Sequence, residues 1–181
     1  DLLGGNTATD AQKKLAKAML NYGAYAQLYF GYNTNNLANA GNADNELAVT
    51  KSELQSFKPV VDGENETFTY AGSTLLLEAD VKVRHYFKLK EGREYTGSGL
   101  TLYAAQPGDN LTGTYYYWES AGIPAASLGT MTEYTGVNGI TINYCPLSYV
   151  TTAVVNTDTT LTEDTKLQNL LKALYLYYQA T

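Results

Sequence analysis

The chain has one cysteine, Cys145, among its 181 residues, so no disulfide can form within it. It is also poor in basic residues. The 12 Lys and Arg are outnumbered by 18 Asp and Glu, which gives a formal net charge of −6. Nucleic-acid binding needs clustered cations that neutralise phosphates, so we expect no nucleic-acid partner. No apolar run reaches the length of about 18 residues that a membrane-spanning helix needs, so we also expect no membrane insertion.

Histidine is equally scarce, and His85 is the only one. A catalytic triad needs a histidine base that an acid orients, and the sequence has no Gly-x-Ser-x-Gly motif for a nucleophile. A zinc site needs several His or Cys ligands, which His85 and Cys145 cannot supply. We therefore interpret His85 as a structural strand residue and Cys145 as a small buried hydrophobe, and we expect no enzymatic activity, cofactor or metal.

Oxygen ligands for calcium cluster in two segments, Asp62 with Glu64, Asn65 and Glu66, and Asp158 with Glu163 and Asp164. Neither segment has the spacing of a recognised calcium-binding loop. We interpret both as solvated turns.

Helical periodicity marks both ends of the sequence. Thr9 and Gln12 have capping-box spacing, and they precede an apolar stripe that predicts a helix from Thr9 to Phe30. A second capping pair, Thr160 and Glu163, precedes a closing helix whose apolar face holds Leu167, Leu170, Leu171, Leu174 and Tyr178. A shorter helix is expected between Thr50 and Pro59, after an Asn- and Gly-rich loop over Asn33 to Asn45.

The middle of the chain changes to the period-two pattern of strands. Val81 to Leu89 alternates clearly, and six shorter candidates are Thr67–Tyr70, Thr74–Leu77, Leu100–Ala104, Thr114–Glu119, Thr132–Tyr134 and Gly139–Tyr144. The predicted fold class is α+β, with an antiparallel sheet or β-sandwich core flanked by two long amphipathic helices at the termini. Residues 1–31 are the N-terminal helix, which belongs either to this domain or to a preceding repeat, and residues 32–181 are a β-rich domain that the closing helix completes.

Tyr115, Tyr116, Tyr117 and Trp118 form a continuous aromatic run. In a strand, Tyr115 and Tyr117 point to one side and Tyr116 and Trp118 to the other, so one pair is expected in the core. Tyr and Trp stack on the apolar faces of sugars when they are exposed. These four residues are therefore our candidate ligand-binding residues, with Trp118 and Tyr116 first, against the alternative that the run is ordinary sheet packing.

Three stretches resemble a known family. They are AKAMLNYGAYAQLYFGYNTNNLANA (16–40), YYYWESAGIPAASLGTMTEYTGVNGITINYCPLSYV (115–150) and LQNLLKALYLYYQA (167–180). They are similar to an uncharacterised module repeated in large extracellular proteins of gut and rumen Firmicutes, where it accompanies leucine-rich repeats, dockerins and glycosidases. The resemblance implies a helix, a central sheet and a closing helix, a helical stretch over Pro146 to Val155, and no catalytic residue. It also implies a secreted or cell-surface location in a Gram-positive bacterium.

Two functions remain open from the sequence. One is a structural spacer or surface-display module, whose partners are the neighbouring modules of the same polypeptide. The other is a glycan-binding or adhesion module that uses exposed aromatics. Because the chain is acidic overall, a neutral glycan is the expected ligand in the second case.

Overall fold

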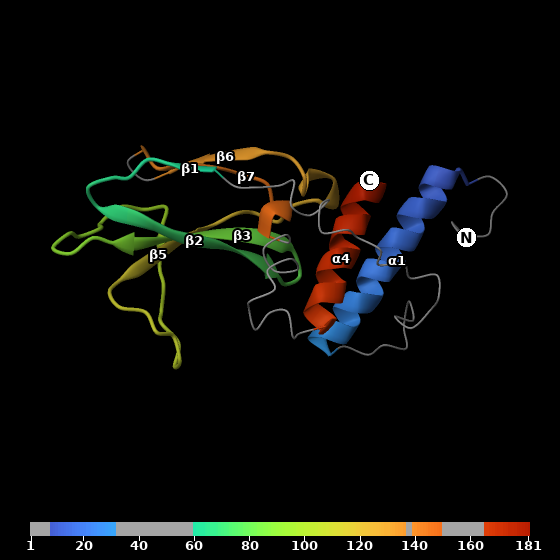
Figure 1. Cartoon of the computed structure of the whole chain (residues 1–181), viewed down its shortest axis with the longest axis horizontal. Helices are drawn as coiled ribbons and strands as arrows, with labels where there is room; N and C mark the ends of the chain where they lie inside the picture. The colour runs from blue at the N-terminus through green and yellow to red at the C-terminus, as the bar shows by residue number, and fades with distance from the viewer. Residues whose placement is uncertain (1–7, 32–59, 137–138, 150–164) are drawn as a thin grey trace.

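The computed structural model describes residues 8–31, 60–136, 139–149 and 165–181 (Figure 1). Its elements are α1 (Asp10–Phe30), β1 (Val60–Asp62), β2 (Phe68–Leu77), β3 (Val81–Leu89), β4 (Thr101–Leu102), β5 (Tyr115–Glu119), the short 3-10 helix η1 (Ala125–Ser127), β6 (Thr132–Thr135), β7 (Thr141–Tyr144) and α4 (Thr165–Ala180). The predicted helix before Pro59, the loop over Asn33 to Asn45 and the Thr160–Glu163 capping pair lie outside the described residues.

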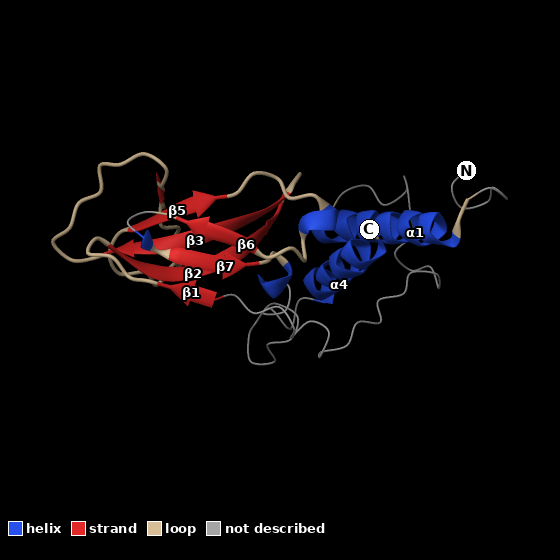
Figure 2. Cartoon of the chain, turned by 90° about the horizontal axis from the view of Figure 1, so that it is seen from above, coloured by secondary structure: helices blue, strands red, loops and turns tan. Residues whose placement is uncertain are grey.

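The strands form two antiparallel sheets that face each other (Figures 1 and 2). The larger sheet has the order β2-β3-β5-β4 and the smaller one has the order β1-β7-β6. The predicted α+β class with antiparallel sheets is confirmed.

The strands β2 and β3 form a long hairpin with one irregularity. The register runs from Phe68 opposite Leu89 to Tyr70 opposite Phe87, and then shifts so that Gly72 lies opposite Tyr86. Gly72 has a φ of 115°, which a residue with a side chain rarely adopts. The sequence predicted two strands here, and the structure corrects this to one, because the bulge at Gly72 lets the strand continue.

The two sheets share a core made of large apolar side chains from both. Its buried members are Phe68, Val83, Phe87, Tyr134, Ile140, Ile142 and Tyr144. On β3 the buried Val83, His85 and Phe87 alternate with half-buried residues, as the period-two pattern predicted. The side chains that alternate with them therefore lie on the outer side of the larger sheet, and they are Lys82, Arg84, Tyr86 and Lys88.

The two helices pack on each other at one end of the sheets (Figure 1). Thr9 caps α1 with the predicted capping box, and Gly31 ends the helix in the left-handed region with a φ of 70°. Tyr25 of α1 contacts Leu170 and Ala173 of α4. A second set of α4 side chains covers the end of the sheets. These are Leu171, Leu174 and Tyr175, which pack with Leu128, Cys145 and Leu147. The two helices thus lie at one end of the two sheets, and neither α1 nor α4 covers the outer face of the larger sheet.

The segment after β7 turns into a helix at once. Leu147 to Tyr149 are helical, in keeping with the predicted helix over Pro146 to Val155, and the remainder of that stretch lies outside the described residues. Cys145, which precedes it, is buried, and burial raises the pKa of its thiol. Neither α1 nor α4, nor any other helix in the described ranges, combines the length and apolar character needed to cross a bilayer.

Candidate functional site: a tyrosine face on the larger sheet

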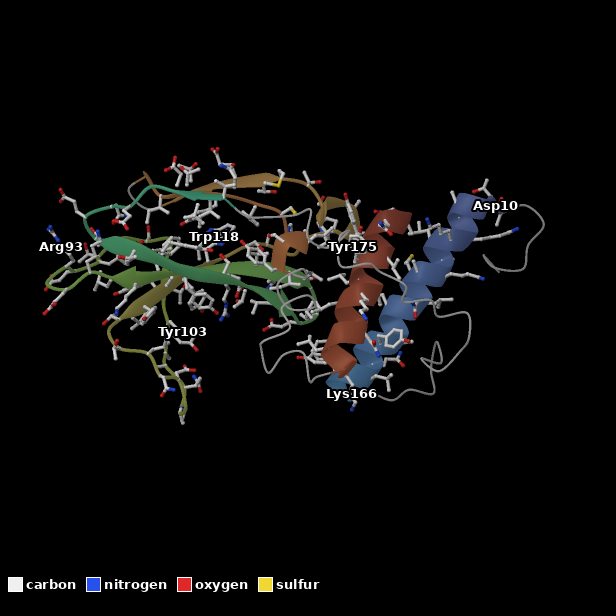
Figure 3. The ribbon with its side chains drawn as sticks, viewed as in Figure 1. Asp10, Arg93, Tyr103, Trp118, Lys166 and Tyr175 are labelled. Atoms are coloured by element: carbon white, nitrogen blue, oxygen red, sulfur yellow. The ribbon has the colours of Figure 1, made fainter. Side chains whose placement is uncertain are left out.

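The pairing of β3 with β5 orients the aromatic run. Trp118 lies opposite the buried His85 and Tyr116 opposite the buried Phe87, so these two side chains point between the sheets. Tyr115 lies opposite Lys88 and Tyr117 opposite Tyr86, on the outer side. Figure 3 shows Trp118 between the two sheets.

The inner pair of the run packs into the core. The Trp118 ring stacks on His85 with a centroid distance of 5.3 Å and an interplanar angle of 11°, and its centroid lies 4.8 Å from that of Tyr134. Tyr116 meets Phe68 edge to face at 5.7 Å. All four residues of the run are half-buried, and the strand pairing places Trp118 and Tyr116 on the core side and Tyr115 and Tyr117 on the outer side.

The outer pair belongs to a larger cluster that we call the tyrosine face. It is formed by outward side chains of β3, β5 and the end of β4, namely Lys82, Arg84, Tyr86, Lys88, Tyr103, Tyr115, Tyr117 and Glu119. The Tyr86 ring lies 6.1 Å from Tyr117 and 5.7 Å from Tyr103, in tilted and edge-to-face contacts. Tyr103 lies on the side of the larger sheet away from the smaller one (Figure 3).

The guanidinium group of Arg84 is part of this face. The Arg84 Cζ atom lies 4.1 Å from the centre of the Tyr117 ring, and its Nε donates to Glu119 Oε1 at 2.7 Å. Lys82 Nζ lies 3.7 Å from the other oxygen of Glu119. Partial burial lowers the pKa of Arg84. Its hydrogen bonds to Glu119 and Tyr86 raise the pKa by more than burial lowers it, so the net pKa is above the ordinary value. Arg84 therefore stays charged and holds the rings of two strands together.

Tyr103 is fixed by the loop that follows β4. Its hydroxyl donates to Asp109 Oδ2 at 3.0 Å, and the same carboxylate oxygen accepts from the Gln106 backbone N–H at 2.7 Å. The bond to Asp109 raises the pKa of the Tyr103 phenol, since it favours the protonated hydroxyl. This edge of the tyrosine face is therefore held in place by a closed turn.

His85 is a buried strand residue, as the sequence analysis predicted, and its ring is a polar group inside the core. His85 is 0% exposed, its Nδ1 lies 2.6 Å from Ser73 Oγ, and Ser73 Oγ lies 2.5 Å from the Tyr70 hydroxyl. Within the described residues, the buried Nε2 of His85 has no hydrogen-bond partner. Burial lowers the pKa of His85 to about 4. A serine beside a histidine can act as a nucleophile, but this pair lies in the core, where His85 has no contact with solvent.

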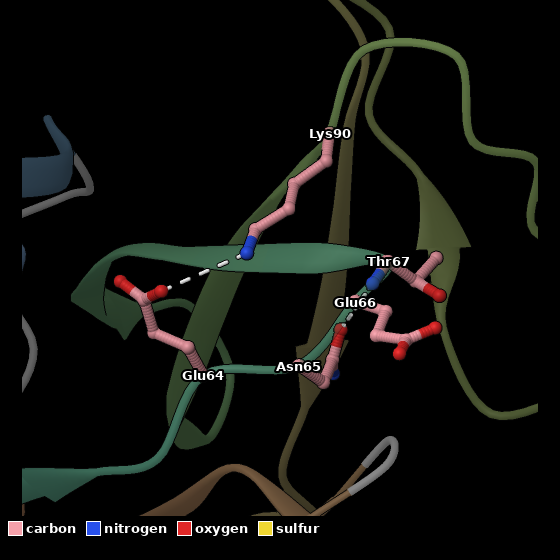
Figure 4. A pocket seen from close by; sticks show the side chains of 5 residues that line it. All are labelled: Glu64, Asn65, Glu66, Thr67 and Lys90. Atoms are coloured by element: carbon pink, nitrogen blue, oxygen red, sulfur yellow. Dashed lines mark hydrogen bonds and ion pairs between the residues drawn. The ribbon is translucent and has the colours of Figure 1, made fainter.

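The acidic segment at Asp62 to Glu66 forms a shallow pocket that is lined by Glu64, Asn65, Glu66, Thr67 and Lys90 (Figure 4). Lys90 Nζ lies 3.6 Å from Glu64 Oε2, and Asn65 Oδ1 accepts from the backbone N–H of Thr67 at 2.7 Å. The carboxylates of Glu64 and Glu66 point in opposite directions (Figure 4). Asn65 thus forms an Asx turn beside a surface ion pair. Asp62 was predicted to lie in the same turn, but it is the last residue of β1 and pairs with Thr141. Asp158, Glu163 and Asp164 lie outside the described residues.

Comparisons with known proteins identify no family for this chain. No protein-family model matches the chain, and neither the curated proteins nor the solved structures contain a match. In the ranges that the structure describes, no three His, Cys, Asp or Glu side chains come close enough to hold a metal ion.

Sequence reasoning found two of the four tyrosines of the tyrosine face. It selected Tyr115 and Tyr117 with the inner pair, but it did not select Arg84, Tyr86 or Tyr103. The alternation of Val81 to Leu89 already put Arg84 and Tyr86 on one side of a strand. The missing information was the strand pairing, which brings Tyr86 opposite Tyr117 across 31 residues of sequence.

Proposed function

We propose that this chain is a non-catalytic carbohydrate-binding module of a secreted or cell-surface multidomain protein of a Gram-positive bacterium. It binds a polysaccharide through the tyrosine face. The observation that carries the proposal is the set of four tyrosines and one arginine gathered on the outer side of a sheet. Outer faces of antiparallel sheets are ordinarily polar, whereas Tyr and Arg are enriched where proteins bind partners.

The chemistry of these side chains suits a sugar chain. A tyrosine offers a rigid apolar ring for the C–H face of a sugar and a hydroxyl for its polar groups, at little cost in conformational entropy. The contacts of Tyr86 with Tyr103 and Tyr117 fix the rings before a ligand arrives. The tilt between them, 52° and 87°, gives a stepped surface, which fits a twisted chain of sugars better than a flat crystalline one.

Tyr117 is the residue whose replacement tests this function. Tyr117→Ala is expected to weaken retention by the bound polysaccharide about tenfold or more, since a central aromatic contact of an interface contributes on the order of 2 kcal/mol. The measurement is affinity electrophoresis in gels that each contain one soluble plant polysaccharide, neutral or uronate-bearing. Met131→Ala is the matched control, because Met131 is 56% exposed beside the smaller sheet. Equal retention of wild type and Tyr117→Ala would contradict the proposal.

A second candidate, surface display, is supported by where α1 begins and where α4 ends. The start of α1 and the end of α4 lie at the same end of the helix pair, and the sheets project away from it (Figure 1). A module inserted between neighbours through these ends stands out from the main chain as a side arm. If wild type binds no polysaccharide in any gel, display of neighbouring modules becomes the better proposal.

A further inference from the structure

The tyrosine face carries a charge that differs from that of the whole protein. Its three cations, Lys82, Arg84 and Lys88, stand against one carboxylate, Glu119, whereas the chain has a net charge of −6. Asp109 borders the face, and its carboxylate accepts hydrogen bonds from Tyr103 and from the backbone of Gln106. The tyrosine face therefore carries a net positive charge, although the whole protein carries a net negative one.

Lys88 is the cation that a ligand can use. Glu119 is shared by Lys82 and Arg84, at 3.7 and 2.7 Å. Lys88 contacts the Tyr115 ring, with its Nζ 5.9 Å from the ring centre, and no carboxylate of the described residues pairs with it. Its side chain thus places an unneutralised ammonium group beside the rings on which a sugar would lie.

Resting on the proposed function, we infer that the ligand of the tyrosine face is a polysaccharide that carries carboxylates, a chain with uronic acid residues. The sugar rings lie on Tyr117 and its neighbours, and a carboxylate of the chain pairs with Lys88. The overall charge predicted a neutral glycan. At physiological ionic strength, however, the screening length is about 8 Å, so the charges beside the ligand outweigh the distant acidic residues.

A matched pair of polymers tests this inference. Polygalacturonate and its fully methyl-esterified form have the same backbone and differ in charge, so binding of the pair isolates the carboxylate. Wild type is expected to bind polygalacturonate about tenfold more tightly than the ester, because a charge-assisted contact is worth a factor of that order. The preference should shrink between about 0.05 M and about 0.5 M salt.

Lys88→Gln should remove most of the preference for polygalacturonate over the ester, because it removes the ammonium group that pairs with the carboxylate. Lys17→Gln, on the exposed side of α1, is the control and should behave as wild type. Equal binding of the two polymers by wild type would overturn the inference and leave the proposed function intact. Tighter binding of dextran sulfate than of polygalacturonate would overturn it as well, since that result shows attraction to charge without recognition of the sugar. Binding of neither polymer nor of any neutral one would overturn both proposals.

Discussion

Trp118→Ala is expected to lower the free energy of unfolding by about 3–5 kcal/mol, the range measured when a packed tryptophan or phenylalanine is truncated. The physical reason is the position of the indole ring between the two sheets, where it stacks on His85 and contacts Tyr134. Truncation leaves a cavity beside a fully buried imidazole. Equilibrium unfolding in urea, followed by circular dichroism, measures the change.

Tyr117→Ala is the matched control, because it removes the adjacent ring of the same strand from the outer side. We expect it to cost about 1 kcal/mol, from the lost contact with Tyr86. The ratio of the two losses reports which side of β5 faces the core. A smaller loss for Trp118→Ala than for Tyr117→Ala would mean that the register of β5 is shifted by one residue.

Acid is expected to destabilise the protein through His85. Its pKa is about 4 in the fold and about 6.5 in the unfolded chain. Between these values the unfolded chain binds a proton that the folded one does not, so stability is complete above pH 6.5 and falls as the pH drops toward 4. The linkage predicts a loss of about 2 kcal/mol by pH 5 and about 3 kcal/mol near pH 4.

The cause is the surroundings of the ring. Trp118, Tyr134 and Tyr144 enclose His85 with aromatic rings, and Ser73 with Tyr70 supplies the polar side. No charged group is among these contacts, so a proton on the ring would create a buried cation without a counter-ion.

The readout is unambiguous because His85 is the only histidine. Its ring-proton resonance can be titrated directly by NMR, and urea unfolding from pH 7 to pH 5 gives the stability. His85→Gln serves as the control, since it lacks the titrating group and should show a flatter dependence over the same range. A ring pKa near 6.5 in the folded protein would contradict the prediction.

The N-terminal end of α1 and the strand β3 were predictable from the sequence, because each is determined by residues that are close together in the chain. The capping box of Thr9 and Gln12 and the alternation of Val81 to Leu89 depend on neighbours within a few residues. The bulge at Gly72 was missed because a glycine in a strand pattern signals either an end or a bulge. Only the pairing with Tyr86 distinguishes the two.

The candidate site was harder to predict, because it is made by pairing between distant strands. The period of two required that one pair of the aromatic run be internal, but it gave no preference for a side. Trp118 is the largest ring and was ranked first as a ligand-binding residue. It lies inward because His85, directly opposite on β3, is on the buried side of that strand. The arginine and the two further tyrosines of the face became visible only with the register.

The most direct test of the account is an NMR titration that maps the bound surface. Labelled wild-type protein is titrated with short fragments of polygalacturonate, and amide shifts are followed for all assigned residues. We expect the largest changes on the outer side of β3, β5 and the end of β4, at Lys88, Tyr103 and Tyr117, with none at Thr132 or Glu133 of β6. Shifts confined to the smaller sheet or to the helices, with the tyrosine face unchanged, would contradict the account.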